Sequence, residues 1–316
     1  MSKKILITGS LGHIGSKLIH NLEENKFSEV RMIDNLSTQR FSSLFNLSPK
    51  INFSFYNEDI LSADLNKYFK DVDTVVHLAA LTDAETSFVR KEEVEEVNHI
   101  GTQKVIDACA ERGCKLIFPS TTSVYGSQED TVDETCSKKD LLPQSPYAES
   151  KLRCEDIILE MSKKNNIQSS ILRFGTIFGP SKGMRFHTAV NKFCWQAVLG
   201  QSLSVWRTAL NQKRPYLGLN DAINIIKFFI DKDIFTGEIF NAVTSNNTVQ
   251  EVVNYIKKYV EEVKVDFVDT KIMNQLSYEV ATKKVESLGF KFFDNLEEGI
   301  KETINLLSAL KHNSQD

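Results

Sequence analysis

The sequence predicts an α/β protein built on a doubly wound parallel sheet, followed by a smaller C-terminal α/β domain. In the first half of the chain, short apolar runs alternate with amphipathic helical patterns, the rhythm of a parallel sheet with helices on both faces. At 316 residues the chain suits one large domain, or one and a half. We expect the sheet domain over residues 1–175 and the second domain mainly over 176–316, with a segment near 215–243 returning to the first.

Six apolar runs are the expected strands, and turn residues or helical patterns separate them. In chain order the runs are Lys4–Thr8, Val30–Ile33, Ile51–Phe55, Thr74–His77, Lys115–Phe118 and Ser169–Arg173. The helical patterns extend from Ile14 to Leu22, from about Glu92 to Arg112, and from Ser145 to about Lys164. The last of these begins with a serine N-cap followed by Pro146, which is a strong start signal for a helix.

Composition excludes several classes of function. A net charge of −4 provides no electrostatic footprint for nucleic acid or an anionic membrane, and no apolar run approaches the length of a membrane span. The five cysteines are scattered without a C-x-x-C pair, and the six histidines show no metal spacing. The first eight residues suit a buried strand better than a signal peptide. We therefore expect a cytoplasmic protein with free thiols, no metal site and no nucleic-acid or membrane partner.

Three glycines between the first strand and the first helix predict a dinucleotide site. Gly9, Gly12 and Gly15 form a G-x-x-G-x-x-G pattern, which allows a tight turn and close approach of the backbone to a pyrophosphate. Asp34 ends the second strand, where its carboxylate can accept hydrogen bonds from the ribose hydroxyls of NAD. The same carboxylate would repel a 2′-phosphate. The pattern therefore predicts a Rossmann-type domain that binds NAD rather than NADP.

Tyr147 and Lys151 lie one helical turn apart, so their side chains share a helix face. We expect the ammonium to lower the pKa of the phenol from its usual value of about 10, because a nearby positive charge favours the phenolate. Such a phenol can take a proton from an alcohol and return it. An incidental Tyr/Lys pair on an exposed helix is the alternative for this motif alone.

Taken together, these segments resemble the extended short-chain dehydrogenase/reductases of the NAD-dependent nucleotide-sugar epimerase/dehydratase family, in particular its UDP-glucose 4-epimerase-like members. The similar segments run almost end to end: Thr8–Gly15, Asp34–Ser37, Asp59–Ile60, His77–Ala80, Val97–Thr102, Ser120–Gly126, Tyr147–Lys151, Leu172–Pro180, Arg214–Asp221 and Glu297–Thr303. The resemblance implies an enzyme with NAD as cofactor and a nucleotide-diphosphate sugar as substrate. It also implies a homodimer formed through the helices that begin near Glu92 and Ser145.

The resemblance also assigns roles by position. The implied catalytic residues are Thr121, Tyr147 and Lys151. Besides Lys151, the implied cofactor residues are Gly9, Gly12, His13, Ile14, Gly15, Asp34, Asn35, Ser37, Asp59, Ile60, Leu78, Ala79, Ala80, Asn98 and Phe174. The implied substrate residues are Thr121, Thr176, Arg185, Arg207 and Arg214.

The basic segment around Trp206 departs from the family pattern. Arg207 and Arg214 are candidates for the substrate diphosphate, since guanidinium forks match phosphate oxygens. A solvated basic loop is the alternative for both arginines. Trp206 is expected to fill the core rather than to stack on a base.

Two positions narrow the reaction. Dehydratases of the family carry an Asp/Glu pair where this chain has Thr122 and Ser123, and its decarboxylases typically carry glutamate at the second of these positions. Both activities are therefore disfavoured, which leaves hydride exchange at one carbon and favours epimerisation, usually at C4. A dehydrogenase or 4-keto reductase with net redox change would use the same residues and stays open. A non-catalytic dinucleotide sensor is disfavoured because such proteins usually lose the Tyr/Lys pair, and this chain has both Tyr147 and Lys151.

Overall fold

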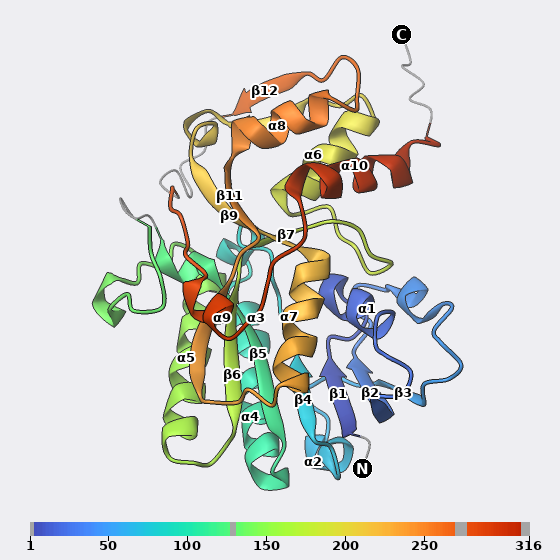
Figure 1. Ribbon diagram of the computed structural model, residues 1–316, viewed down its shortest axis with the longest axis vertical. Helices are drawn as coiled ribbons and strands as arrows, with labels where there is room; N and C mark the ends of the chain where they lie inside the picture. Colours follow the sequence, from blue (N-terminus) through green and yellow to red (C-terminus); the bar gives the residue numbers. More distant parts are fainter. Residues whose placement is uncertain (1–2, 127–130, 269–276, 311–316) are drawn as a thin grey trace.

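The fold is centred on a seven-stranded sheet in which all paired neighbours are parallel (Figure 1). The structure is a computed structural model that describes residues 3–126, 131–268 and 277–310. The strand order is β10-β6-β5-β4-β1-β2-β3. These strands are β1 (Lys3–Thr8), β2 (Phe27–Asp34), β3 (Phe53–Asn57), β4 (Thr74–His77), β5 (Lys115–Thr121), β6 (Ser169–Phe174) and β10 (Glu238–Ala242). The predicted α/β fold class with a doubly wound parallel sheet is confirmed.

Helices cover both faces of this sheet. The helices beside it are α1 (His13–Ile19), α2 (Leu65–Phe69), α4 (Gly101–Arg112), α5 (Pro146–Lys163) and α7 (Leu219–Asp231). Side chains alternate along β1, so Ile5 and Ile7 join the apolar cluster that contains residues of α1 and α7, whereas Leu6 joins the cluster on the α4 and α5 side. The long helix expected near Glu92–Arg112 is present, as α3 (Lys91–Val94), a π-helical segment η3 (Glu95–Ile100) and α4 in succession.

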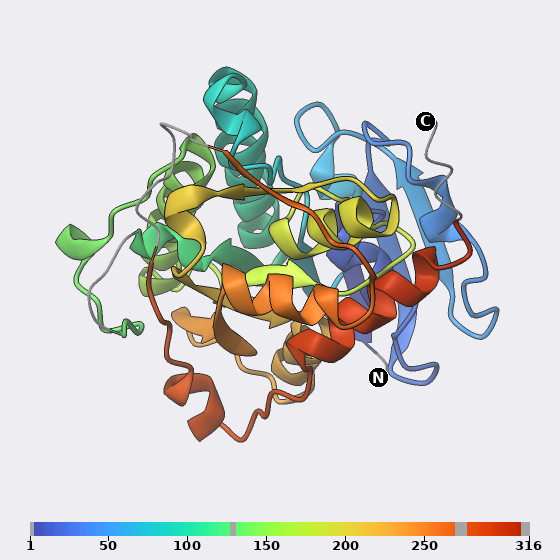
Figure 2. The same ribbon diagram turned by 90° about the horizontal axis from the view of Figure 1, so that it is seen from above.

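The short helix α9 (Lys283–Ser287) lies beside β10. Most of the other elements form a second layer above the carboxyl ends of the large sheet (Figures 1 and 2). They are α6 (Ala189–Val198), α8 (Val249–Lys257), α10 (Leu296–Leu307), and two small sheets. The small sheets are β7 (Thr176–Phe178), β9 (Lys213–Gly218) and β11 (Ser245–Thr248), and the pair β8 (Leu203–Trp206) and β12 (Val265–Val268). After this layer has begun, the chain returns to the large sheet, where β10 pairs with β6 at the edge. The expected domain boundaries themselves stay a prediction.

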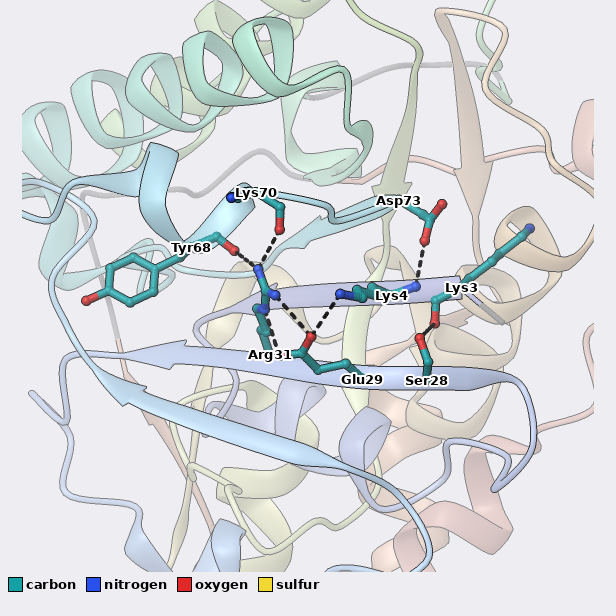
Figure 3. Close-up of polar contacts among 8 residues, drawn as sticks. All are labelled: Lys3, Lys4, Ser28, Glu29, Arg31, Tyr68, Lys70 and Asp73. Carbon is teal, nitrogen blue, oxygen red and sulfur yellow. Dashed lines mark hydrogen bonds and ion pairs between the residues drawn. The ribbon is translucent and has the colours of Figure 1, made fainter. Parts of the chain in front are cut away.

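Polar contacts fasten the opposite end of the sheet, towards the starts of β1 and β2 (Figure 3). The Arg31 guanidinium donates to the carbonyl oxygens of Tyr68 and Lys70 at the end of α2, 2.7 Å from each. The Glu29 carboxylate accepts from the Arg31 Nε at 2.8 Å and pairs with the Lys4 ammonium at 3.5 Å. These contacts hold β1, β2 and α2 together at the end away from the carboxyl ends of the strands.

The five cysteines are free thiols, as predicted, and all except Cys136 are buried. Within the part of the chain that the structure describes, none of the helices combines the length and apolar character that crossing a bilayer requires.

Candidate active site

The predicted site residues meet above the carboxyl ends of the parallel strands. A cavity of about 630 Å³ extends from the loop after β1 to α6, β8 and β9. It opens beside β1 and β4, the neighbours at which the strand order reverses, and such a switch point is where doubly wound sheets bind ligands. All the predicted cofactor, catalytic and substrate residues line this cavity except Asn98 and Arg207.

The glycine loop is shaped so that side chains are excluded from it. A Cβ on Gly9, whose φ is +64°, would lie 2.6 Å from the backbone nitrogen of Ala79. A Cβ on Gly15 would lie 2.6 Å from the carbonyl oxygens of both Gly9 and Ser10. Each glycine therefore permits a close approach between backbone segments, and together they present bare backbone to the cavity.

Acidic and amide side chains follow β2 and β3 at the next part of the cavity wall. The Asp34 carboxylate accepts from the backbone N–H of Leu11 at 3.0 Å and of Leu36 at 2.9 Å, which ties the glycine loop to the end of β2. The Asn35 amide donates to the Asp59 carboxylate at 2.9 Å. Two backbone N–H donors thus orient Asp34 at the position expected for a ribose ligand.

Asn98 supports the cavity wall from behind and does not line it. Its amide accepts from the Leu81 N–H at 2.7 Å, donates to the Leu81 carbonyl at 2.9 Å, and donates to the Ser150 hydroxyl at 3.2 Å. These bonds use both the oxygen and the nitrogen of the side-chain amide, and the residue is buried. The structure therefore places Asn98, predicted as a cofactor residue, where it fixes the loop after β4.

Thr121, Tyr147 and Lys151 come together from β5 and α5. Ser145 caps α5 by accepting from the Ala148 N–H at 3.2 Å, and Tyr147 is hydrogen-bonded to the Thr121 side chain. The Lys151 ammonium donates to the Pro119 carbonyl at 2.9 Å. The lysine is therefore fastened to the strand that ends at Thr121, and all three side chains face one space.

Burial, rather than the neighbouring ammonium, decides the pKa of the tyrosine in the free protein. Burial raises the pKa of Tyr147 to about 12, and the hydrogen bond with Thr121 acts in the opposite direction. Burial also lowers the pKa of Lys151 to about 8. The expected lowering of the tyrosine pKa by Lys151 is therefore wrong for the free protein, since the ammonium is directed to Pro119 and the phenol loses solvation.

Neither of the two positions after Thr121 carries a carboxyl group: they are Thr122 and Ser123. The Thr122 hydroxyl donates to the Phe174 carbonyl at 3.4 Å, and the Tyr278 phenol donates to the Thr122 hydroxyl at 3.5 Å. Ser123 lines the cavity. Tyr278 therefore packs against the place where an acid/base pair would have to be, and its own pKa is raised by burial, so it stays a neutral phenol.

The far end of the cavity carries basic and aromatic groups from the second layer. Arg214 lines it, and burial lowers the pKa of this guanidinium. Beside it, the buried Tyr216 hydroxyl has no hydrogen-bond partner among the described residues. Arg207, in contrast, lies outside the cavity with its guanidinium 5.3 Å from the centre of the Phe267 ring. Arg207 begins the short helical turn after β8, and its side chain lies outside the cavity. Its expected role at the substrate diphosphate is therefore not supported.

Comparison with known proteins agrees with this geometry. Residues 5–242 match the family model described as the NAD dependent epimerase/dehydratase family. The chain belongs to this family. Among curated members, the mouse dTDP-D-glucose 4,6-dehydratase is 30% identical over 331 residues, covering 99% of this chain and 90% of that protein. An uncharacterized UDP-glucose epimerase of Bacillus subtilis is 31% identical over 247 residues, covering 75% of this chain and 76% of that one.

Solved structures of family members have the same fold. The UDP-N-acetylglucosamine 4-epimerase of Methanobrevibacter ruminantium, in complex with UDP-N-acetylmuramic acid, is similar with a TM-score of 0.86 at 25% identity, covering 98% of this chain and 99% of that chain. The UDP-glucuronic acid 4-epimerase of Bacillus cereus, in complex with UDP-glucuronic acid and NAD, is similar with a TM-score of 0.84 at 26% identity, covering 98% of this chain and all of that one.

The family confirms the predictions of an enzyme and of NAD as its cofactor. The chain's own geometry fits this cofactor: Gly9, Gly12 and Gly15 line the cavity without side chains, and the Asp34 carboxylate lines it at the end of β2, where it could accept from the ribose hydroxyls. Within the described residues, no group of three His, Cys, Asp or Glu side chains could hold a metal ion.

Sequence reasoning missed several residues of the cavity. Arg40, Lys192 and Tyr278 line it, and none of them stands in a motif that a single sequence makes visible. Trp206, expected in the core, lines the cavity and also packs against the apolar cluster of the second layer. Lys192 on α6 and Trp206 on β8 come to the site from the second layer, and the Tyr278 N–H donates to the Lys213 carbonyl on β9 at 3.1 Å, whereas Arg40 follows β2.

Proposed function

We propose that the protein epimerises a nucleotide-diphosphate sugar, at C4 and through a transient 4-keto intermediate. The observation that carries the proposal is the catalytic trio of Thr121, Tyr147 and Lys151 with hydroxyl residues, not carboxyls, at the two positions that follow Thr121. Such a site can exchange a hydride and a proton at one carbinol carbon but offers no acid/base pair for removal of water.

The proposed roles follow from the contacts. Tyr147 takes the proton of the sugar hydroxyl and later returns it, while the Thr121 hydroxyl holds the same oxygen as the ketone forms. NAD, when bound, accepts the hydride from the sugar carbon and returns it. Lys151 keeps a positive charge at the buried end of the site, where it favours the phenolate of Tyr147 once substrate and cofactor have displaced water.

We place the substrate diphosphate near Arg214 and the sugar near Thr176 and Tyr278. Arg214 is a half-buried cation that donates to the Gln212 side chain at 3.2 Å, and the Tyr216 hydroxyl beside it has no hydrogen-bond partner among the described residues. A diphosphate would supply acceptors to both groups. The bound ligands named for the similar structures support a UDP-sugar as the first substrate to test.

The deciding experiment incubates the NAD-loaded protein with UDP-, GDP-, CDP- and dTDP-sugars and follows each by NMR and by absorbance of NADH. Epimerisation predicts a second sugar isomer with no accumulated NADH. Stoichiometric NADH would show the alternative, a dehydrogenase or 4-keto reductase, and a 4-keto-6-deoxy product would show a dehydratase like the mouse relative. The Tyr147→Phe variant should lose about 10²–10⁴-fold in turnover and still bind NAD.

A homodimer through the helices that begin near Glu92 and Ser145 stays a proposal, as does a cytoplasmic location. Half-exposed Ile100 on η3 supports an interface on this face, because an apolar side chain there gains from burial. Light scattering of the purified protein would measure its mass directly.

A further inference from the structure

Two arginines that belong to different segments meet at the glycine loop. Arg40 follows β2, and its Nη1 lies 3.6 Å from the position that a Cβ on Gly12 would occupy. Arg185 comes from the segment between β7 and α6, and its Nη2 donates to the Thr82 hydroxyl at 2.8 Å, just after the Leu78–Ala80 wall. Both guanidinium groups line the cavity at its cofactor end.

The segment Gly179–Arg185, here called the strap, is held against the glycine loop by hydrogen bonds. The Ser181 hydroxyl donates to the His13 carbonyl at 2.9 Å, and the Gly183 N–H donates to the Ser16 hydroxyl at 3.0 Å. Arg40 Nη1 donates to the Gly183 carbonyl at 2.9 Å. The strap therefore carries Arg185 at a fixed place relative to the glycine loop, and Arg40 is part of its attachment.

The strap touches the glycine loop so closely that only glycine fits. A Cβ on Gly183 would lie 2.3 Å from the Leu11 carbonyl oxygen and 2.6 Å from the Gly12 carbonyl oxygen. The backbone of the strap thus lies directly against the turn that must approach the pyrophosphate. A cation carried by this strap is close to any ligand that the turn binds.

Positive charge gathers here, and the carboxylates near it that the structure describes are not in ion-pair contact with either arginine. Among the described residues neither Arg40 nor Arg185 forms an ion pair with a carboxylate, although both are half-buried. Burial lowers the pKa of both guanidinium groups, that of Arg40 to about 10. The charge of Arg185 lowers the pKa of Arg40 further and Asp34 raises it, while Asp83 raises the pKa of Arg185 and Arg90 lowers it. His13 and His187 lie in the same field and are kept neutral by burial. An anion bound among these groups would relieve the repulsion.

We propose that Arg40 and Arg185 bind the pyrophosphate of NAD and that the strap, held by both arginines, slows release of the cofactor. The proposal assigns Arg185 to the cofactor, whereas the resemblance implied a role at the substrate. Its neighbours favour the change, because Thr82, the strap and Gly12 surround the cofactor end of the cavity, whereas Arg214 stands at the other end. Retention of NAD between turnovers suits an enzyme that returns every hydride it takes.

The test measures release of NAD from the loaded protein by dilution, rapid filtration and chromatography of the free nucleotide. Arg40→Met and Arg185→Met should each speed release by about 10- to 100-fold, the loss expected for one charge-assisted contact to phosphate. Arg112→Met is the matched control: it removes an exposed arginine at the end of α4, outside both the cavity and the strap, and release should stay at the wild-type rate.

A second measurement identifies the part of the cofactor that is bound. Adenosine and ADP compete with NAD, and only ADP carries the pyrophosphate. The arginine variants should lose affinity for ADP and keep their affinity for adenosine, and Arg185→Lys should recover part of the loss. Wild-type release from both methionine variants would overturn the proposal, as would an equal loss of adenosine and ADP. It would also be overturned if Arg185→Met weakened UDP binding to the loaded protein and left NAD release unchanged.

Discussion

Arg173 and Glu155 form a two-point ion pair in the interior, linking β6 to α5. The Arg173 Nε lies 3.0 Å from Glu155 Oε1 and its Nη2 lies 2.7 Å from Oε2, and both side chains are almost completely buried. The Ser120 hydroxyl donates to the same carboxylate. Glu155 follows Lys151 by one helical turn, and Ser120 precedes Thr121, so the Glu155 carboxylate connects α5 and β5, the two elements that carry Thr121, Tyr147 and Lys151.

Removing the charge of Glu155 should destabilise the protein strongly. In Glu155→Gln the Arg173 guanidinium would stay buried without its counter-charge, which costs about 3–5 kcal/mol of unfolding free energy. Urea unfolding followed by circular dichroism measures this loss. Asp156→Asn is the control on the same helix, because the exposed pair of Asp156 with Lys138 is worth at most about 1 kcal/mol. Equal losses in the two variants would contradict the assignment.

The buried charge of Lys151 should lower the free energy of unfolding of the free protein at neutral pH. Its pKa is lowered from 10.5 to about 8 by burial, so the unfolded chain binds more protons between these values and stability should rise as pH increases from 8 to 10.5. Below pH 8 the full cost of the buried charge applies, about 3 kcal/mol.

Lys151→Met should therefore be more stable than the parent at pH 7, by about 1–3 kcal/mol after loss of the bond to Pro119, and should lack the rise above pH 8. It should also be inactive. Urea unfolding across pH 7–10 checks both points, and a variant less stable than the parent at pH 7 would show that the charge is well compensated.

Asp34 should select NAD over NADP. In Asp34→Ala the ribose hydroxyls lose their acceptor, whereas a 2′-phosphate loses a repelling charge, so affinity should fall much further for NAD than for NADP. Calorimetric titration of the free protein with each dinucleotide measures the two changes. Parallel losses would mean that Asp34 only holds the glycine loop through Leu11.

Gly183 should not tolerate even one methyl group. In Gly183→Ala the new Cβ would press on backbone oxygens of Leu11 and Gly12, which cannot move without distorting the cofactor turn. We expect a loss of about 1–3 kcal/mol in stability together with weaker NAD binding. Gly113→Ala is the control for NAD binding, because its Cβ would meet no atom within 4 Å and the residue ends α4 outside the cavity; it should cost only the strain of the left-handed backbone, about 1–2 kcal/mol, and leave NAD affinity unchanged. Thermal unfolding and NAD titration of both variants decide the point.

Much of the fold could be predicted because its signals are local. Strands, the helix after Ser145 and the glycine loop depend on residues close in the chain, and they were found where expected, although β3 begins at Phe53 rather than Ile51. Asn98 was misplaced because its partners are 17 and 52 positions away, and no local pattern shows which face of η3 is inward. Arg40 was missed for the same reason: Gly183, which accepts from it, is 143 positions away.

The sequence by itself determined the family, the cofactor and the chemical groups available, since Tyr147, Lys151, Asp34 and the glycines carry these properties in their residue types and short spacings. Only the tertiary structure decided how those groups behave. Burial raises the pKa of Tyr147 and lowers that of Lys151, and the strap brings Arg185 to the glycine loop while β8 carries Arg207 outside. The physical reason is that solvation and charge interactions depend on distances in space, which contacts between distant parts of the chain establish.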